Sequence, residues 1–217
     1  MKKRIMSSCI GIFLLMQMST VSAVLLYDNG DSAWSGATTI SWGGVGADDF
    51  ILTQDASLAG VSVDIWVSSS YDISNFEGMN WWVFDNNNGD PGNIINSGSS
   101  QNSMLTFVDI HHSGNVEFWK LFFEFGKDIP LQKENTYWLA LRTINHSDPI
   151  SWSNSPVIGF DDAYSADGTF DNWEHTSNPA VDHAFSLYGN PVPAPPAILF
   201  FSTGLVWLFG VKTRKYS

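Results

Sequence analysis

Val61-Ser62-Val63-Asp64-Ile65-Trp66-Val67 alternates apolar residues with residues of mixed character. Successive side chains of a strand point to opposite faces, so this alternation predicts a β-strand with one apolar face. Clusters of Gly, Asn, Asp, Ser and Pro separate it from other short apolar segments, and no long amphipathic helix is expected between them. Further strands are predicted at 80–84, 104–110, 116–125, 136–144 and 184–188.

Seven or more strands without helices require two packed sheets, because a single sheet leaves its apolar face in water. The sequence therefore predicts an all-β fold, a jelly-roll-like β-sandwich over residues 24–190, in preference to a closed barrel. No repeat of fixed period is present, which disfavours a propeller or a solenoid. The turn-rich segment 85–92, Asp-Asn-Asn-Asn-Gly-Asp-Pro-Gly, predicts a hairpin with an acidic tip and a return strand near Ile94 and Ile95.

The first 23 residues have the three parts of a secretory signal peptide. Lys2-Lys3-Arg4 begins it, an apolar run follows, and Val21-Ser22-Ala23 ends it with a small-residue cleavage pattern. The apolar run is shorter than the roughly 20 residues of a spanning helix, so cleavage after Ala23 is expected rather than permanent anchoring. The only cysteine of the chain, Cys9, lies inside this signal, and the exported domain is expected to fold without a disulfide.

The C-terminal end also divides into three parts. Residues 191–196 form a Pro-rich linker, 197–211 are apolar and uncharged, and 212–217 carry the basic residues Lys212, Arg214 and Lys215. We expect 197–211 to be a single transmembrane helix whose basic tail stays in the cytoplasm, so that the sandwich faces outwards. The alternative is a C-terminal core element of the domain, since about 1.5 Å per residue gives a length of about 22 Å against a hydrocarbon core of about 30 Å.

Val192-Pro193-Ala194-Pro195, the apolar stretch and the basic end, taken in this order, resemble a PEP-CTERM sorting signal. In that family an exosortase, a membrane-embedded enzyme similar to cysteine transpeptidases, recognises the tag in Gram-negative bacteria that make exopolysaccharide. The resemblance implies that Val192, Pro193, Ala194 and Pro195 form the recognition motif, with Ala194 where the namesake pattern has Glu. It also implies an exosortase-type partner, a stage in the inner membrane and release to the cell surface or exopolysaccharide matrix. The β-sandwich domains that often precede such tags have no established activity.

Charge is distributed unevenly along the chain. All 22 acidic residues lie between Asp28 and Asp182, where only four basic residues accompany them, so this region has a formal charge of −18. Such a surface repels phosphate backbones, and we exclude nucleic acid as a partner. Its carboxylates suit Ca²⁺, and Asp85, Asp90, Asp161 and Asp162 are candidate ligands of a structural calcium ion. Ordinary turn chemistry is the alternative, because the glycine of segment 85–92 is misplaced for an EF-hand loop.

The residue pattern offers candidate contacts for sugar binding but no candidate catalytic pair. Glu117 and Glu124 are seven residues apart, so on one strand they point to opposite faces and do not form a glycosidase pair. The histidines lack the spacing of a zinc site, and we expect no enzyme activity. The candidate sugar contacts, chosen because an indole ring stacks on a sugar ring, are Trp34, Trp66, Trp152 and Trp173. A lectin-like module is therefore the alternative to a surface protein without a ligand, and an extracellular hydrolase is the third hypothesis.

Overall fold

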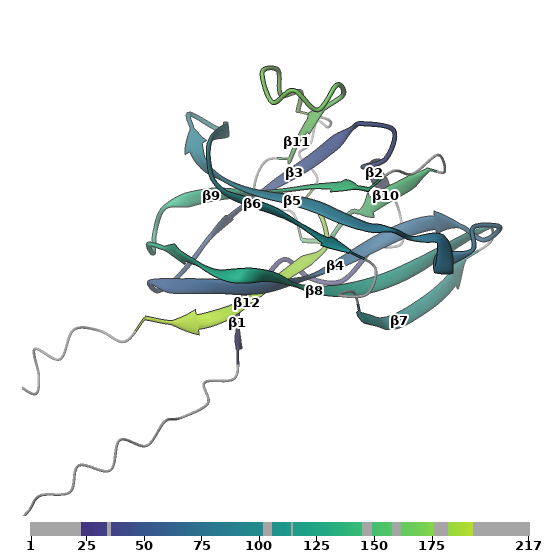
Figure 1. The fold of residues 1–217 in the computed structure, drawn as a ribbon, viewed down its shortest axis with the longest axis horizontal. Helices are drawn as coiled ribbons and strands as arrows, with labels where there is room; N and C mark the ends of the chain where they lie inside the picture. Colours follow the sequence, from purple (N-terminus) through teal and green to yellow (C-terminus); the bar gives the residue numbers. More distant parts are fainter. Residues whose placement is uncertain are drawn as a thin grey trace, which may run out of the picture.

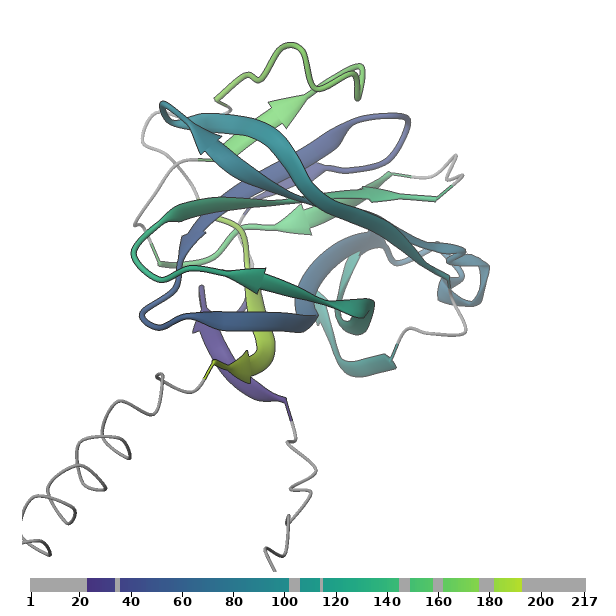
Figure 2. The ribbon, with the colours of Figure 1, turned by 60° about the vertical axis from the view of Figure 1, so that its left-hand side comes forward.

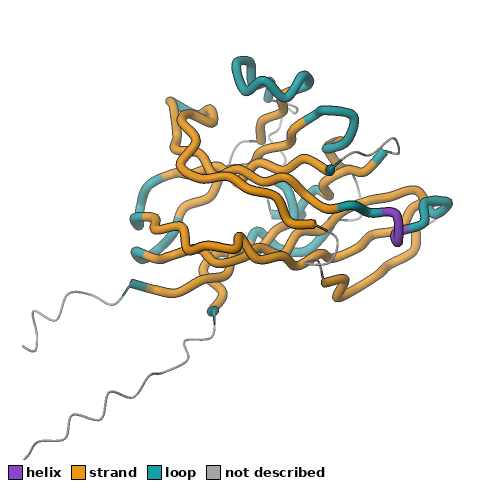
Figure 3. Tube along the Cα trace, viewed as in Figure 1, coloured by secondary structure: helices purple, strands orange, loops and turns teal. Residues whose placement is uncertain are grey.

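The computed structural model describes residues 23–33, 36–101, 106–113, 115–144, 149–157, 162–175 and 182–192, and for 106–113 it describes the backbone only. These residues form two antiparallel sheets that face each other (Figures 1 and 3). Sheet A contains β1 (Val24–Asp28), β2 (Ala37–Thr39), β4 (Ala56–Ser68), β7 (Thr106–Ser113), β8 (Val116–Leu131), β10 (Ile150–Ser153) and β12 (Phe185–Pro191). Sheet B contains β3 (Val45–Ile51), β5 (Gly78–Asn87), β6 (Asp90–Gln101), β9 (Thr136–Thr143) and β11 (Asp162–Ser165).

The strand order is that of a jelly roll with extended edges. In sheet A, β8 pairs with the whole of β4 on one side, while β12 and then β10 pair with it on the other. Sheet B has the order β11-β3-β9-β5-β6. Eight of the strands form the jelly roll, namely β1, β3, β4, β5, β6, β8, β9 and β12. Numbered one to eight along the chain, they lie in the order 1-8-3-6 in sheet A and 2-7-4-5 in sheet B, which is the two-sheet order of a jelly roll. The other four strands lie beside these eight and widen both sheets.

The hydrophobic core lies between the two sheets. Val61, Val63, Ile65 and Val67 of β4 have no exposed surface, which confirms the strand predicted from their alternation. They belong to the same apolar cluster as Phe50 of β3, Trp81 of β5 and Leu139 and Leu141 of β9. Trp81 packs directly against β6, where a Cβ on Gly98 would lie 2.6 Å from Trp81 Cζ2. Glycine is therefore required at that position for the two strands to pair.

A second apolar cluster covers the outer face of sheet B. Phe84 of β5 and Trp138 of β9 are buried there, and the loop that follows β11 lies over them through Phe170 and Trp173. Both faces of the central strands of sheet B are thus shielded from water. This explains why β9 reads as a continuous apolar run rather than an alternating one.

The predicted hairpin is present with a tighter turn than expected. β5 and β6 pair as far as Asn87 and Asp90, which leaves Asn88 and Gly89 as the two turn residues. Both have positive φ, 57° and 100°, the geometry that favours Asn-Gly in a two-residue hairpin loop. By contrast, β1, β2, β3, β10 and β11 were not predicted, because they are short and several carry Asp, Gly or Ser on buried faces.

The predicted combination of a β-sandwich with a C-terminal transmembrane helix is wrong for the described structure. The described part of the chain contains one helical element, the three-residue 3-10 turn η1 (Ile73–Asn75), and no helix long and apolar enough to cross a membrane. The predicted span, 197–211, lies outside the described residues.

The two ends of the sandwich leave it side by side. β1 and β12 pair antiparallel at the edge of sheet A, with Val24 opposite Gly189 (Figure 2). Beyond β12, the Val192 amide donates a hydrogen bond to the Asp55 carbonyl, at 2.8 Å. Residue 23 and residue 192 therefore emerge from the domain at the same end of the β1–β12 pair.

We predict that Phe123→Ala lowers the free energy of unfolding by about 3–5 kcal/mol, since Phe123 is fully buried and leaves a large cavity. Phe122→Ala is the matched control, because Phe122 points to the outer face and touches Tyr188 at 5.6 Å between ring centroids. The Phe122→Ala variant should lower the free energy of unfolding by only about 1 kcal/mol. Urea denaturation measures both values. Equal losses would mean that β8 is shifted by one residue from the register described.

Candidate functional site

A row of side chains crosses the outer face of sheet A. Thr39 of β2 is opposite Ser151 of β10, Ser151 is opposite Trp66 of β4, and Trp66 is opposite Phe118 of β8. Opposed residues on antiparallel strands project to the same face, so the row places two hydroxyls beside two aromatic rings. Four strands contribute to it, which gives a length of three strand spacings, or about 14 Å.

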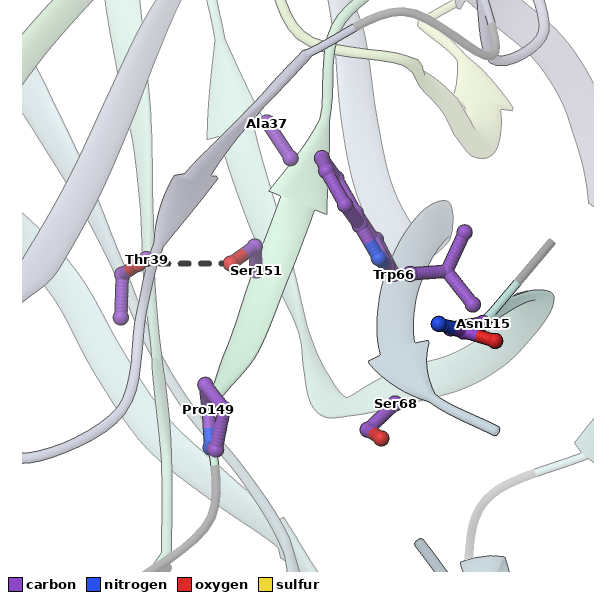
Figure 4. A pocket seen from close by; sticks show the side chains of 8 residues that line it. Ala37, Thr39, Trp66, Ser68, Asn115, Pro149 and Ser151 are labelled. Atoms are coloured by element: carbon purple, nitrogen blue, oxygen red, sulfur yellow. Dashed lines mark hydrogen bonds between the residues drawn. The ribbon is translucent and has the colours of Figure 1, made fainter. Parts of the chain in front are cut away.

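An open groove of about 360 Å³ lies over this row (Figure 4). We call it the Trp66 groove and define it by Thr39, Trp66, Ser68, Asn115, Pro149 and Ser151. In Figure 4 the indole of Trp66 lies between the Thr39–Ser151 pair and Asn115. No described residue that lines the groove carries a charge.

The Trp66 ring is held in place from below. It is half-buried and stacks on Phe118, with ring centroids 6.0 Å apart and an angle of 26° between the planes. Phe118 itself is only 4% exposed, so it supports the indole rather than competing with it for a ligand. On the other side, the hydroxyls of Thr39 and Ser151 are 3.4 Å apart and join β2 to β10. A ligand therefore meets a preformed surface and orders few side chains when it binds.

The described lining of this groove presents stacking and hydrogen-bonding groups. Its residues offer an aromatic face, hydroxyls and one amide, and none of these described residues carries a carboxylate, imidazole or thiol. Glu117 and Glu124 do not form a pair elsewhere on β8, because they lie seven residues apart along the strand, opposite Val67 and Gly60 of β4. An aromatic ring with neutral hydrogen-bonding groups around it is suited to the apolar face and hydroxyls of a sugar.

A second hollow, of about 500 Å³, lies on the side of sheet B. We call it the hairpin hollow and define it by Asp85, Asn86, Asp90, Phe170, Asp171 and Trp173. It brings together two predicted calcium ligands, Asp85 and Asp90, and one predicted sugar contact, Trp173. Across the described residues, no group of three or more His, Cys, Asp or Glu side chains is arranged to hold a metal ion.

The other predicted sugar and calcium residues are not brought together with these. Trp152 is fully buried and donates its indole N–H to the Ala184 carbonyl at 3.0 Å, so its prediction as a sugar contact is corrected to a core role. Asp162 is buried at the start of β11, where its backbone carbonyl accepts a hydrogen bond from Nδ1 of His175 at 2.9 Å. Trp34 and Asp161 lie outside the described residues.

The sorting-motif residues are placed only in part. Val192 is described and is 51% exposed just beyond β12. The remaining motif and basic-tail residues lie outside the described residues, namely Pro193, Ala194, Pro195, Lys212, Arg214 and Lys215.

Sequence reasoning missed a buried polar cluster at one end of the sandwich. The Asp48 carboxylate of β3 accepts hydrogen bonds from the His183 backbone amide and from the Asn29 side chain, the latter at 3.4 Å. His183 is fully buried, its ring stacks on Trp152 at 4.7 Å between centroids, and neither ring nitrogen has a hydrogen-bond partner. Nothing in the local sequence marks this histidine as enclosed, and only the tertiary packing reveals it.

The cluster shifts the pKa of both groups because burial disfavours their charged forms. Burial raises the pKa of Asp48 well above its usual range; the hydrogen bond from the His183 amide opposes this rise, while Asp182, Asp49 and Asp162 add to it. Burial lowers the pKa of His183 to about 4, although the nearby Asp162 carboxylate acts in the opposite direction. Near pH 7 His183 is therefore neutral in the folded protein.

Comparison with known proteins supplies no relative that could assign a role to these sites. No protein-family model matches the chain, and no curated protein is similar enough to it to count as a match. Function therefore has to be inferred from the geometry of the sites.

We predict that His183 makes the protein sensitive to acid. The folded-state pKa lies below the ordinary value of 6.5, so the stability that His183 confers is complete above about pH 6.5 and is lost as the pH falls towards 4. Between pH 7 and pH 4.5 the free energy of unfolding should fall by roughly 2–3 kcal/mol more in the wild type than in His183→Gln. Over this pH range the raised pKa of Asp48 changes the free energy of unfolding in the opposite direction. Asp48 is present in both proteins, so the difference between their pH profiles reports on His183 alone. Parallel pH profiles in urea denaturation would contradict a buried, neutral ring.

Proposed function

We propose that this protein is an exported, non-catalytic protein of the bacterial cell envelope that binds a neutral polysaccharide in the Trp66 groove. The observation that carries the proposal is the uncharged row of Thr39, Ser151 and Trp66, with the indole fixed on Phe118. The ligand class follows from the chemistry of that row. The apolar face of a sugar ring stacks on the indole, and its hydroxyls exchange hydrogen bonds with Thr39, Ser151 and Asn115.

The dimensions of the groove favour a chain of sugars over a single one. The row crosses four strands, about 14 Å, and the groove is open rather than enclosed, so a polymer is able to enter and leave at both ends. Its hydroxyls and amide select for hydrogen-bonding partners, and its described lining residues, all uncharged, favour neither anionic nor cationic ligands. An exopolysaccharide outside the cell is a ligand of this kind.

Export is supported by the sequence and by the position of the domain ends. The signal-like segment 1–23 and the PEP-CTERM-like tail flank a domain without cysteine. Because β1 and β12 pair at one edge, both flanking segments join the domain at the same place. An exosortase-type enzyme would therefore be able to remove the tail while the core strands stay covered.

The Trp66 groove is tested with the Trp66→Ala variant against a panel of neutral polysaccharides, measured by affinity electrophoresis and titration calorimetry. The variant should bind about tenfold or more weakly, because one lost stacking contact is worth about 1.4 kcal/mol. Phe122→Ala is the control, since Phe122 lies on the same face of sheet A but does not line the groove. If the wild type binds none of the panel, or if Trp66→Ala binds as well as the wild type, the proposed function is wrong.

Sorting is tested separately by the intact mass of the native protein recovered from the outer-surface fraction. We expect the mass to lack both the signal segment and the residues after the Val192–Pro195 motif. A Pro193→Gly, Pro195→Gly double variant should keep its tail, because the recognition motif is destroyed while the domain is untouched. Recovery of wild-type protein that retains Lys212 to Ser217 would refute processing at the motif without affecting the carbohydrate-binding proposal.

A further inference from the structure

Trp42 is the most exposed large apolar residue in the part of the chain that the structure describes, with 63% of its surface in contact with solvent. It lies between β2 and β3, in a turn that the Gly44 amide closes by donating a hydrogen bond to the Ser41 carbonyl at 3.1 Å. A tryptophan stabilises a fold mainly through the apolar area that it buries, so folding gains little from an indole in this position.

The backbone of Trp42 has a conformation that tryptophan rarely adopts. The φ angle is 57° at Trp42 and 92° at Gly43. The β5–β6 turn has closely similar values, 57° at Asn88 and 100° at Gly89. A two-residue turn with two positive φ angles favours Asn-Gly, whereas a bulky side chain in the left-handed region is strained. The 41–44 turn therefore carries tryptophan where its geometry favours asparagine.

Packing accounts for a second aromatic residue with positive φ, Phe170, but not for Trp42. Phe170 has a φ of 64° and meets the rings of Phe84, Trp82 and Trp173 in the second apolar cluster. Those contacts offset its backbone strain. The largely exposed Trp42 has no comparable burial, and strain of this kind is typical of residues that contact a ligand.

The 41–44 turn lies beyond one end of the Trp66 groove. Pro149 lines this end, at the bottom of Figure 4. Here β2 and β10 stay together past the lining of the groove, because Ser41 Oγ accepts a hydrogen bond from the Ile150 amide at 3.2 Å. Trp42 follows Ser41 directly, so the turn extends this wall of the groove outwards.

The turn is held in place by close contacts with sheet B. A Cβ on Gly44 would collide with the Tyr164 hydroxyl of β11, and a Cβ on Gly168 would lie 2.7 Å from the Gly43 carbonyl. The turn therefore rests against β11 and the loop that follows it. Its position is set before a ligand arrives, so binding needs to order little of the backbone.

The backbones of Trp42 and Trp66 are further apart than the width of one sugar ring. Across the sheet, Trp66 is two strand spacings from Thr39, or about 10 Å. Along the chain, Trp42 is three residues from Thr39, which is again about 10 Å in extended backbone. The two steps are nearly perpendicular and together give about 14 Å. A chain of several sugars is therefore needed to touch both indoles.

We propose that Trp42 is a second stacking residue for the polysaccharide, which is bound as a chain that runs from Trp66 past Pro149 to Trp42. The proposal rests on the proposed function and adds a length requirement to it. One sugar unit lies on the Trp66 indole, and a later unit of the same chain lies on the Trp42 indole. Short oligosaccharides occupy the Trp66 groove alone, whereas longer ones gain the second contact.

The experiment uses the full protein and the neutral polysaccharide of the panel that binds it most tightly, cut by partial acid hydrolysis into a disaccharide and a hexasaccharide. In titration calorimetry the wild type should bind the hexasaccharide about tenfold more tightly, since only the longer chain reaches both indoles. Trp42→Asn should remove most of this difference and leave binding of the disaccharide unchanged. An unchanged difference, or an equal loss for both oligosaccharides, would overturn the proposal.

Stability separates a ligand contact from a structural role. Asparagine suits the turn, so the urea midpoint of Trp42→Asn should equal or exceed that of the wild type. A lower midpoint would show that the indole supports the fold, and the proposal would then be wrong.

Ile94→Asn is the matched control, because Ile94 is 49% exposed on β6 of sheet B and its replacement removes apolar surface away from the groove. This variant should keep the wild-type difference between hexasaccharide and disaccharide. If Ile94→Asn lost the difference to the same extent as Trp42→Asn, the effect would not be specific to Trp42 and the proposal would fail.

Trp66→Ala distinguishes this proposal from the proposed function. If Trp66→Ala weakens binding of both oligosaccharides while Trp42→Asn changes neither, the Trp66 groove stands and the role of Trp42 is refuted. If the wild type binds none of the panel, or if Trp66→Ala binds as well as the wild type, both proposals are refuted together.

Discussion

The pairing of β4 with three partner strands is the constraint on which the rest of the structure depends. One face of β4 carries four buried apolar residues, Val61, Val63, Ile65 and Val67, that fill the centre of the core. Its other face carries Trp66, which the same register places between β10 and β8. A shift of β4 by one residue would bury Trp66 and expose the valines, so the core and the Trp66 groove are fixed by one register.

Part of this fold can be predicted from the sequence because local residue patterns specify it. Alternation over 61–67 locates β4, and Asn88-Gly89 between two apolar segments locates the β5–β6 turn. β10 and β2 give no such signal, because each is short and their pairing joins residues 112 positions apart, as in the contact of Thr39 with Ser151. Of the Trp66 groove, only the indole itself was foreseen, since most of the residues around it come from distant parts of the chain, namely β2, β10 and the residues that precede β8 and β10.

Burial of polar residues was the other feature that sequence patterns could not show. Asp48 and His183 look like ordinary surface residues of acidic loops, yet they join β3 of sheet B to the segment that precedes β12 of sheet A. Trp152, which could equally have faced a ligand, is enclosed by the same contacts through its stacking on His183. In a domain without cysteine, this cluster connects the two sheets without a disulfide.

The side-by-side exit of the two domain ends has a mechanical consequence. Pro191 of β12 pairs with Ala56 at one end of β4, while Trp66 lies ten residues further along the same strand, at about 3.3 Å per residue. A pull applied between Trp66 and the residues that follow Pro191 is therefore directed along β4 and β12. The hydrogen bonds between these antiparallel strands are then loaded in shear and bear the force together, instead of breaking one after another. Such a geometry resists force along the strands better than one in which the hydrogen bonds break in sequence.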